Sequence, residues 1–332
     1  MKMYIVKALG ILLSLTFLAF IIWCLSATVT TLTKEPDRSK RILVLTKSSD
    51  SEFWKTVYKG AETAANEYNN VELIIEAPVS EDDYGTQNRM IRSAVDKDID
   101  VIVFSACDYD RSVESVESAI DKGIPVISID SYINSDKVQL MIGTDNVAAG
   151  VQAGEAIGAL TGYNANIGII NCEEGGAVGI QREEGFLKVV AKNPGMKVIE
   201  TRYAFSNVED SKKNTLEILK AHPEINAIAT FNEWTTLGVQ EALYELGIDD
   251  DSMAAIGFDS NVKSVEMLEI GVYDGLIVQN PFEIGYLGVK SAIDYDKKKY
   301  KQPRFIDTGT KLITAENMYN IENQKLLFPF SN

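Results

Sequence analysis

The first feature of the chain is an apolar stretch near its N-terminus, residues 8–29, that contains no charge. At 1.5 Å per helical residue it is long enough to cross a bilayer core of about 30 Å. Lys2 and Lys7 precede it, so the positive-inside rule places residues 1–7 in the cytoplasm and the later chain outside. We expect a transmembrane anchor over 8–29, a linker over 30–40, and an extracytoplasmic protein attached to the cell membrane. A cleaved signal peptide, which would leave a secreted or periplasmic protein, is the alternative, although its apolar region is usually about 7–15 residues long.

From residue 41 onward, short β-branched runs alternate with segments whose apolar residues recur every three or four positions. The runs predict strands at 42–46, 71–76, 101–104, 126–129, 140–142, 167–171, 197–203, 227–230 and 254–258. The segments between them predict helices near 53–69, 84–97, 110–122, 146–161, 179–193, 209–221 and 235–246. Strands that are buried on both faces and separated by helices form parallel sheets with right-handed crossovers. The two successive series therefore predict an α/β protein with two doubly wound parallel-sheet lobes.

The residues just after the predicted strands are the first candidates for a binding site, because ligands of open parallel sheets bind beyond the carboxyl ends of the strands. These positions are 47–54, 105–108, 130–131, 171–179, 231–232 and 259–260. They are rich in carboxylates, amides and hydroxyls, which can hold several ligand hydroxyl groups, and in aromatic rings, which cover the apolar face of a sugar. Helix capping is the alternative, since Ser51, Asp108, Asp130 and Asp259 are all good N-cap residues. Because polar and aromatic residues recur at all six of these strand ends, we favour a ligand site over helix capping alone.

The composition restricts the possible partners and cofactors. The chain has 32 basic and 48 acidic residues, a net charge of −16, and such a surface repels nucleic acid and anionic lipid headgroups. His222 is the only histidine, which argues against an imidazole-based zinc site and against most histidine-based catalysis. We expect no metal and no cofactor. Cys107 and Cys172 lie beyond the apolar stretch, and we expect buried thiols there, with a disulfide between them as the alternative.

Seven short sequences, taken in chain order, carry a family resemblance. They are Ser51-Glu52-Phe53-Trp54, Gly123-Ile124-Pro125-Val126 with the following Asp130, Thr144-Asp145-Asn146, Gln181-Arg182-Glu183-Glu184-Gly185-Phe186, Phe231-Asn232-Glu233, Ile256-Gly257-Phe258-Asp259 and Ile277-Val278-Gln279-Asn280-Pro281. The ordered set resembles the type I periplasmic sugar-binding proteins, the ribose- and galactose-binding family, over nearly all of 41–320. The resemblance implies two lobes joined by a three-strand hinge. The first lobe would comprise 41–144 plus 280–310, and the second 145–279 plus 311–332.

The resemblance also implies a set of ligand-binding residues. Phe53 and Trp54 would stack on a sugar ring. The polar candidates that would bond its hydroxyls, or lie beside them at the strand ends, are Ser51, Ser105, Asp130, Ser131, Arg182, Asn232, Asp259 and Gln279.

Some positions differ from the family pattern. Ser131 stands where ribose-binding members carry arginine, so a bidentate donor is lost, and Ser51 replaces an asparagine. At the aromatic clamp of the second lobe, Phe205 or Trp234 is the candidate.

Together these features predict a substrate-binding protein rather than an enzyme. We expect it to capture a monosaccharide or related polyol by hinge closure and to deliver this small-molecule sugar to the membrane permease of an ABC-type importer. A membrane-anchored sensor that reports the sugar to a sensor histidine kinase without transport is the alternative. We expect a monomer that binds no nucleic acid. A sugar-responsive repressor is disfavoured, because it would need a helix-turn-helix where residues 1–30 are membrane-like. A glycosidase is disfavoured as well, because its acid pair would be Asp130 and Asp259, which we expect in opposing lobes.

Overall fold

The computed structural model describes residues 16, 18–23, 38–172, 175–248, 252–295 and 303–329. The chain divides into two compact units, residues 1–39 and residues 40–332. In the first unit, residues 18–23 are helical. Among the described residues, no helix combines the length and the apolar character needed to span a membrane. The predicted stub over 1–7 lies outside the described residues, as does most of the predicted anchor and linker over 8–40.

The second unit contains two six-stranded sheets with the same strand order. The first sheet has the order β11-β5-β4-β3-β1-β2, and all of its neighbouring strands are parallel. The second has the order β12-β10-β9-β8-β6-β7, and β12 runs antiparallel to β10 at its edge. The first-sheet strands are β1 (Lys40–Leu45), β2 (Val71–Glu76), β3 (Val101–Phe104), β4 (Val126–Ile129), β5 (Leu140–Gly143) and β11 (Arg304–Asp307). The second-sheet strands are β6 (Ala165–Asn171), β7 (Met196–Tyr203), β8 (Ala227–Thr230), β9 (Ala254–Phe258), β10 (Gly275–Gln279) and β12 (Thr310–Ile313).

This arrangement confirms the prediction of two doubly wound α/β lobes. The prediction of parallel sheets did not foresee the antiparallel edge strand β12. This strand follows β11 of the first sheet through only Thr308 and Gly309. A connection that short cannot carry the chain to the opposite end of the second sheet, where a strand parallel to β10 would have to begin.

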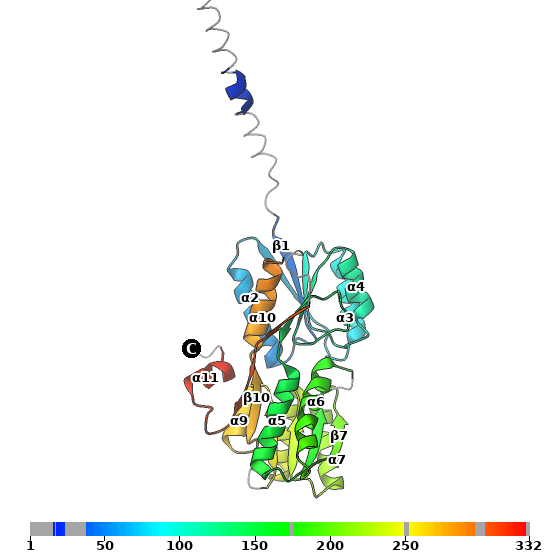
Figure 1. Ribbon diagram of the computed structural model, residues 1–332, viewed down its shortest axis with the longest axis vertical. Coiled ribbons are helices and arrows are strands. Elements are labelled where there is room, and N and C mark those ends of the chain that lie inside the picture. Colours follow the sequence, from blue (N-terminus) through cyan, green and yellow to red (C-terminus); the bar gives the residue numbers. More distant parts are fainter. Residues whose placement is uncertain are drawn as a thin grey trace, which may run out of the picture. The chain divides into compact units, whose positions relative to one another are not determined.

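Helices cover both faces of each sheet, which explains why the central strands are buried on both sides (Figure 1). On the first sheet, Ile42 and Val44 pack toward α2 (Glu52–Asn66) and α10 (Pro281–Ile293), while Leu43 and Leu45 pack toward α3 (Tyr84–Ala94) and α4 (Val113–Asp121). On the second sheet, α5 (Asn146–Thr161) and α6 (Ala177–Lys192) pack on one face. The other face is covered by α7 (Val208–Ala221), α8 (Glu233–Leu246), α9 (Val262–Glu269) and α11 (Ile321–Leu327).

The chain passes between the two sheets three times. It leaves the first sheet after β5, returns after β10 to form α10 and β11, and passes back between β11 and β12. The helix α10 packs along α2 of the first lobe although more than two hundred residues separate them (Figure 1). Because all three connections lie beside β5 and β10, they form a narrow hinge next to the carboxyl ends of both sheets.

Candidate functional site

A pocket, called here the central pocket, lies between the carboxyl ends of the two sheets. Its empty space, counted together with the open solvent at its mouth, is about 350 Å³. The first lobe contributes residues that follow β1, β2 and β4, and the second contributes residues from α6 and from the ends of β6, β8, β9 and β10. The lining residues are Lys47, Ser51, Phe53, Trp54, Glu81, Asp130, Cys172, Val178, Arg182, Asn232, Glu233, Trp234, Asp259 and Gln279.

Two aspartates occupy equivalent places in the two lobes. Asp130 follows β4 with φ of 58°, and Asp259 follows β9 with φ of 69°. Each backbone N–H donates to the neighbouring strand, that of Asp130 to the Ile142 carbonyl and that of Asp259 to the Ile277 carbonyl. A left-handed conformation outside glycine is uncommon and tends to occur at functional sites. Here it ends each strand and turns a carboxylate into the central pocket.

Both carboxylates are buried, and their surroundings differ. Asp130 accepts a hydrogen bond from the Ser105 hydroxyl at 3.0 Å and lies 3.7 Å from the Lys47 ammonium. Asp259 accepts one from the Gln279 amide at 2.7 Å. Burial raises the pKa of Asp130 despite the nearby Lys47 and Arg182, and burial likewise raises the pKa of Asp259. Hydroxyl donors from a ligand would supply the hydrogen bonds that these carboxylates lose when water is excluded.

Arg182 lies on α6 with only 1% of its surface exposed. Its Nε donates to Asn146 Oδ1 at 2.9 Å, its Nη1 donates to the Phe231 carbonyl, and its guanidinium lies 4.6 Å from the centre of the Phe258 ring. Within the described residues, Nη2 is buried and has no hydrogen-bond partner. The guanidinium is therefore held rigidly, with its Nη2 amino group left for a ligand oxygen.

An aromatic pair forms the first-lobe wall. Phe53 and Trp54 meet edge to face with 5.0 Å between ring centres. The Trp54 indole donates through Nε1 to Glu81 Oε1 at 2.8 Å, which fixes the ring plane. Trp234 lines the same pocket from the second lobe. Rings on both sides of a polar pocket suit a molecule with an apolar face and a hydroxylated rim.

Helix capping and pocket lining coexist at two positions. The Ser51 hydroxyl accepts from the Trp54 N–H at 3.1 Å and begins α2, and Asn232 forms a capping box with Thr235 at the start of α8. Both residues also line the central pocket. The capping alternative is therefore correct for Ser51, and Asn232 caps a helix although it was not a capping candidate; neither cap excludes a binding role, since a hydroxyl or amide can form more than one hydrogen bond. The other three candidates, Asp108, Asp130 and Asp259, are not the N-cap of any described helix.

Gln279 connects the hinge to the pocket. Its carbonyl oxygen accepts from the Thr144 hydroxyl at 2.8 Å, and its amide donates to Asp259. Nearby, the Asp145 N–H donates to Asp307 Oδ1 at 3.1 Å, so two of the hinge connections are joined directly. Gln279 therefore joins the pocket residue Asp259 to the connection after β5, one of the segments that would bend in a movement of the lobes.

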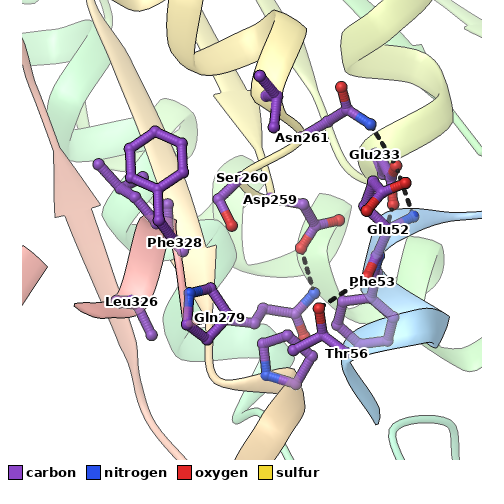
Figure 2. A pocket seen from close by; sticks show the side chains of 15 residues that line it. Glu52, Phe53, Thr56, Glu233, Asp259, Ser260, Asn261, Gln279, Leu326 and Phe328 are labelled. Atoms are coloured by element: carbon purple, nitrogen blue, oxygen red, sulfur yellow. Dashed lines mark hydrogen bonds between the residues drawn. The ribbon is translucent and has the colours of Figure 1, made fainter. Parts of the chain in front are cut away.

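A second, larger cavity adjoins the central pocket, and Figure 2 shows it from close by. This side cavity has about 740 Å³ of empty space and continues toward the C-terminal segment, where Leu326, Leu327 and Phe328 form an apolar wall. It shares four lining residues with the central pocket, namely Phe53, Glu233, Asp259 and Gln279. These four side chains form the partition between the two spaces.

The structure brings most of the predicted site residues together. Ser51, Phe53, Trp54, Asp130, Arg182, Asn232, Asp259 and Gln279 all line the central pocket. Ser105 lies behind it as a hydrogen-bond donor to Asp130, and Ser131 is buried. Phe205 is 52% exposed and is not among the lining residues, whereas Trp234, the other clamp candidate, is. Cys107 and Cys172 are both buried, and Cys172 lines the pocket.

Several lining residues were not among the sequence candidates. Glu81 lies in the loop after β2, an edge strand whose carboxyl end was not among the candidate positions. Lys47 lies in the candidate stretch 47–54 but was not singled out there; it is the second residue after β1 and is 5% exposed, a burial that sequence does not reveal for a lysine. Glu233 was noted only as part of a motif. With these additions, Glu81, Asp130, Glu233 and Asp259 face Lys47 and Arg182, so carboxylates outnumber cations and the pocket disfavours an anionic ligand.

The sequence profile described as the periplasmic binding protein domain matches residues 42–299. The chain belongs to this family. The D-allose-binding periplasmic protein of Escherichia coli is 27% identical over 262 residues, covering 76% of this chain and 84% of that protein. The ribose import binding protein of Bacillus subtilis is 24% identical over 266 residues, covering 80% of this chain and 84% of that protein.

Solved structures agree with this assignment. An ABC transporter solute-binding protein from Agrobacterium vitis with bound D-fucose superposes with a TM-score of 0.82 at 29% identity, covering 86% of this chain and 99% of that chain. A carbohydrate transporter solute-binding protein from Agrobacterium radiobacter in complex with D-arabinose also gives a TM-score of 0.82 at 29% identity, covering 87% and 99%. The predicted membership of the type I periplasmic sugar-binding proteins is confirmed, and the two lobes match the fold of that group.

Proposed function

We propose that this protein is an extracytoplasmic substrate-binding protein that captures a neutral monosaccharide or related polyol in the central pocket for an ABC-type sugar importer. It performs no chemistry on the ligand. Closure of the two lobes around the hinge buries the sugar, and the importer's permease recognises the closed state. Binding of the ligand to both lobes favours that state by its differential affinity.

The observation that carries this proposal is the combination of buried carboxylate acceptors with one buried amino group, Arg182 Nη2, that has no hydrogen-bond partner among the described residues. Asp130 and Asp259 approach from opposite lobes, and Arg182 keeps Nη2 available between them. Carboxylates accept hydrogen bonds from sugar hydroxyls, while a guanidinium donates to hydroxyl or ring oxygens. Trp54 and Phe53, which meet edge to face, supply apolar ring surface for the C–H groups of the sugar. The relatives named for D-allose and ribose, and the neighbours with bound D-fucose and D-arabinose, support the same ligand class.

A thermal-shift screen of the purified protein tests the proposal. The probes are D-allose, D-ribose, D-fucose, D-arabinose and xylitol, each at several concentrations. A ligand present at a hundred times its dissociation constant adds about 2.7 kcal/mol to the free energy of unfolding, which raises the melting temperature by several degrees. Recovery of the sugar unchanged, checked by mass spectrometry, separates binding from turnover. Absence of any shift across neutral sugars and polyols would contradict the proposal.

We also propose that residues 8–29 tether the protein to the cell membrane, and that it acts there as a monomer. The uncharged length of this stretch and the preceding lysines support the tether. Alkaline extraction of membranes should leave the protein in the pellet, and its intact mass should include residues 1–29. A protein released by alkali, or shortened at its N-terminus, would instead favour cleavage of a signal peptide. The sensor-kinase alternative gains no support from the relatives, whose names refer to sugar binding and import.

A further inference from the structure

The first turn of α2 is completed by a side chain from the opposite lobe. The N–H of Glu52 donates to Glu233 Oε1 at 3.1 Å, and the N–H of Phe53 donates to Glu233 Oε2 at 3.0 Å (Figure 2). The Trp54 N–H donates to Ser51 within the first lobe. The first N–H groups of a helix have no partner inside the helix. Two of the three named here therefore depend on a residue that belongs to the second lobe.

Glu233 is itself held in place by the second lobe. It is the first residue of α8, only 4% of its surface is exposed, and Oε1 also accepts from the Asn261 amide at 2.8 Å. A carboxylate at a helix N-terminus gains from the helix dipole and from charge-assisted bonds to the N–H groups. The carboxylate therefore links α8 and the start of α9 in one lobe to α2 in the other.

The linked turn is the one that carries the aromatic pair. Phe53 and Trp54 line the central pocket directly after the N–H groups that Glu233 binds. On the far side of the pair, Glu81 accepts from the Trp54 indole through Oε1 and from the second-lobe Ser206 hydroxyl at 2.8 Å through Oε2. The pair is thus flanked by two contacts between the lobes, and Glu233 makes the one that involves the backbone.

We infer that Glu233 is a positioning residue for ligand capture, whose carboxylate fastens the second lobe to the first turn of α2 and holds Phe53 and Trp54 over the central pocket. This inference rests on the proposed function, in which that pocket receives the sugar. The contact forms only when the lobes are closed, so it stabilises the closed state without ligand. The apparent affinity for sugar rises with the fraction of protein that is already closed.

Glu233→Gln tests the inference, with Glu52→Gln as the matched control. A glutamine amide has one acceptor oxygen, and its NH₂ group faces a backbone N–H that needs an acceptor. Glu52 lies at the same helix end, but its side chain is 53% exposed and pairs with Lys55 at 2.9 Å. Both substitutions remove one negative charge from the N-terminus of α2, and only the first alters a contact between the lobes.

Hydrogen–deuterium exchange on the unliganded full chain gives the direct readout. In the wild type and in Glu52→Gln, the amides of residues 52 and 53 should be protected. In Glu233→Gln they should exchange at least tenfold faster, while α7 of the second lobe keeps its protection. The dissociation constant of the sugar found in the thermal-shift screen should rise at least tenfold in Glu233→Gln and stay within twofold in Glu52→Gln.

Other outcomes decide against the inference or separate it from the proposed function. Unchanged exchange at residues 52 and 53 in Glu233→Gln would overturn it, even if affinity fell, because Glu233 would then act on the ligand alone. If Glu233→Gln does not fold, Asn261→Ala should show the same faster exchange in weaker form, and normal protection in that variant would overturn the inference. If no sugar binds the wild type, the proposed function fails, and the exchange experiment still decides whether Glu233 links the lobes.

Discussion

At the scale of single residues, the central pocket holds charges where the fold would be more stable without them. Asp130 and Asp259 sit in left-handed conformations, and both carboxylates are buried with raised pKa values. Asparagine tolerates this backbone conformation as well as aspartate does, and it carries no charge to bury. The presence of aspartate at both places therefore indicates a need for strong acceptors, at some expense of stability.

Asp259→Asn should separate stability from binding. Burial raises the folded-state pKa of Asp259 above its unfolded value of about 3.9. The Asp259 side chain therefore adds to the free energy of unfolding at low pH, and this contribution is lost as pH rises through the folded-state pKa. We expect the variant to be more stable than the wild type at pH 7.5 and the difference to shrink toward pH 4, while the sugar-dependent thermal shift disappears. Urea denaturation across this pH range measures the first effect. A variant that is less stable than the wild type at pH 7.5 would contradict the argument.

Arg182→Ala should lower both stability and binding. The side chain bonds Asn146 and the Phe231 carbonyl, and its charge offsets part of the rise that burial causes in the pKa of both pocket aspartates. Removing a buried charge from such a network costs about 3 kcal/mol or more and leaves Lys47, beside Asp130, as the remaining cation of the pocket lining. We expect a folded protein with a clearly lower melting temperature and no sugar response. Arg202→Ala is the control, since its ion pairs with Glu200 and Glu217 are partly exposed, and its effect should stay below about 1 kcal/mol.

At the scale of helices and strands, sequence patterns predicted the buried elements best. The strands predicted at 101–104, 126–129 and 227–230 coincide with β3, β4 and β8, because a fully buried strand is a short β-branched run between polar segments. The short edge strands β11 and β12 were not predicted. β11 is mostly exposed, and both strands exist only because the chain returns to pair with β5 and β10. Such partners are distant in sequence and leave no local periodicity.

The candidate site could also be predicted only in part, because some of its residues are positioned by segments that are distant in sequence. Residues directly after buried strands could be predicted, since their position follows from the sheet rule. Glu81 lies in a longer loop after β2, and Lys47 is buried by contacts with Glu81 and Asp130 from two other segments. The reach of Glu233 to the opposite lobe depends on how the lobes meet, which no stretch of sequence encodes by itself.

Close packing between α5 and α6 positions Arg182, and Gly150→Ala tests this. A Cβ atom at Gly150 would lie 1.9 Å from the Arg182 carbonyl oxygen, so α6 would have to shift. We expect a loss of about 1–3 kcal/mol in stability together with weaker sugar binding. Gly158→Ala on the same helix is the control. Its Cβ would meet the Tyr163 ring at 2.4 Å, far along the chain from Arg182, so stability should fall without a change in sugar affinity. Equal losses of affinity in both variants would contradict the role assigned to Gly150.

At the scale of the whole molecule, two lobes with the same strand order meet at their carboxyl ends, and the hinge runs beside β5 and β10. Asp130 and Asp259 are equivalent by this repetition, yet their partners differ, a lysine and serine in one lobe and a hinge glutamine in the other. A symmetric scaffold thus presents an asymmetric set of donors and acceptors. Since Gln279 contacts both Asp259 and the hinge residue Thr144, ligand contact on that side is coupled to lobe movement.

The negative charge of the whole chain and of the central pocket predicts that anionic derivatives of the bound sugar bind more weakly than the neutral sugar. The chain carries a net charge of −16, and the central pocket adds four carboxylates against Lys47 and Arg182. An anion is therefore repelled during approach and again after it is desolvated. We expect the phosphate ester or uronic acid of the bound sugar to bind at least a hundredfold more weakly than the neutral sugar, whose own affinity should hardly change between 10 and 200 mM salt. Titration calorimetry at both salt concentrations measures this. An anionic derivative that binds as tightly as its neutral parent would mean that Lys47 and Arg182, rather than the carboxylates, set the charge preference of the pocket.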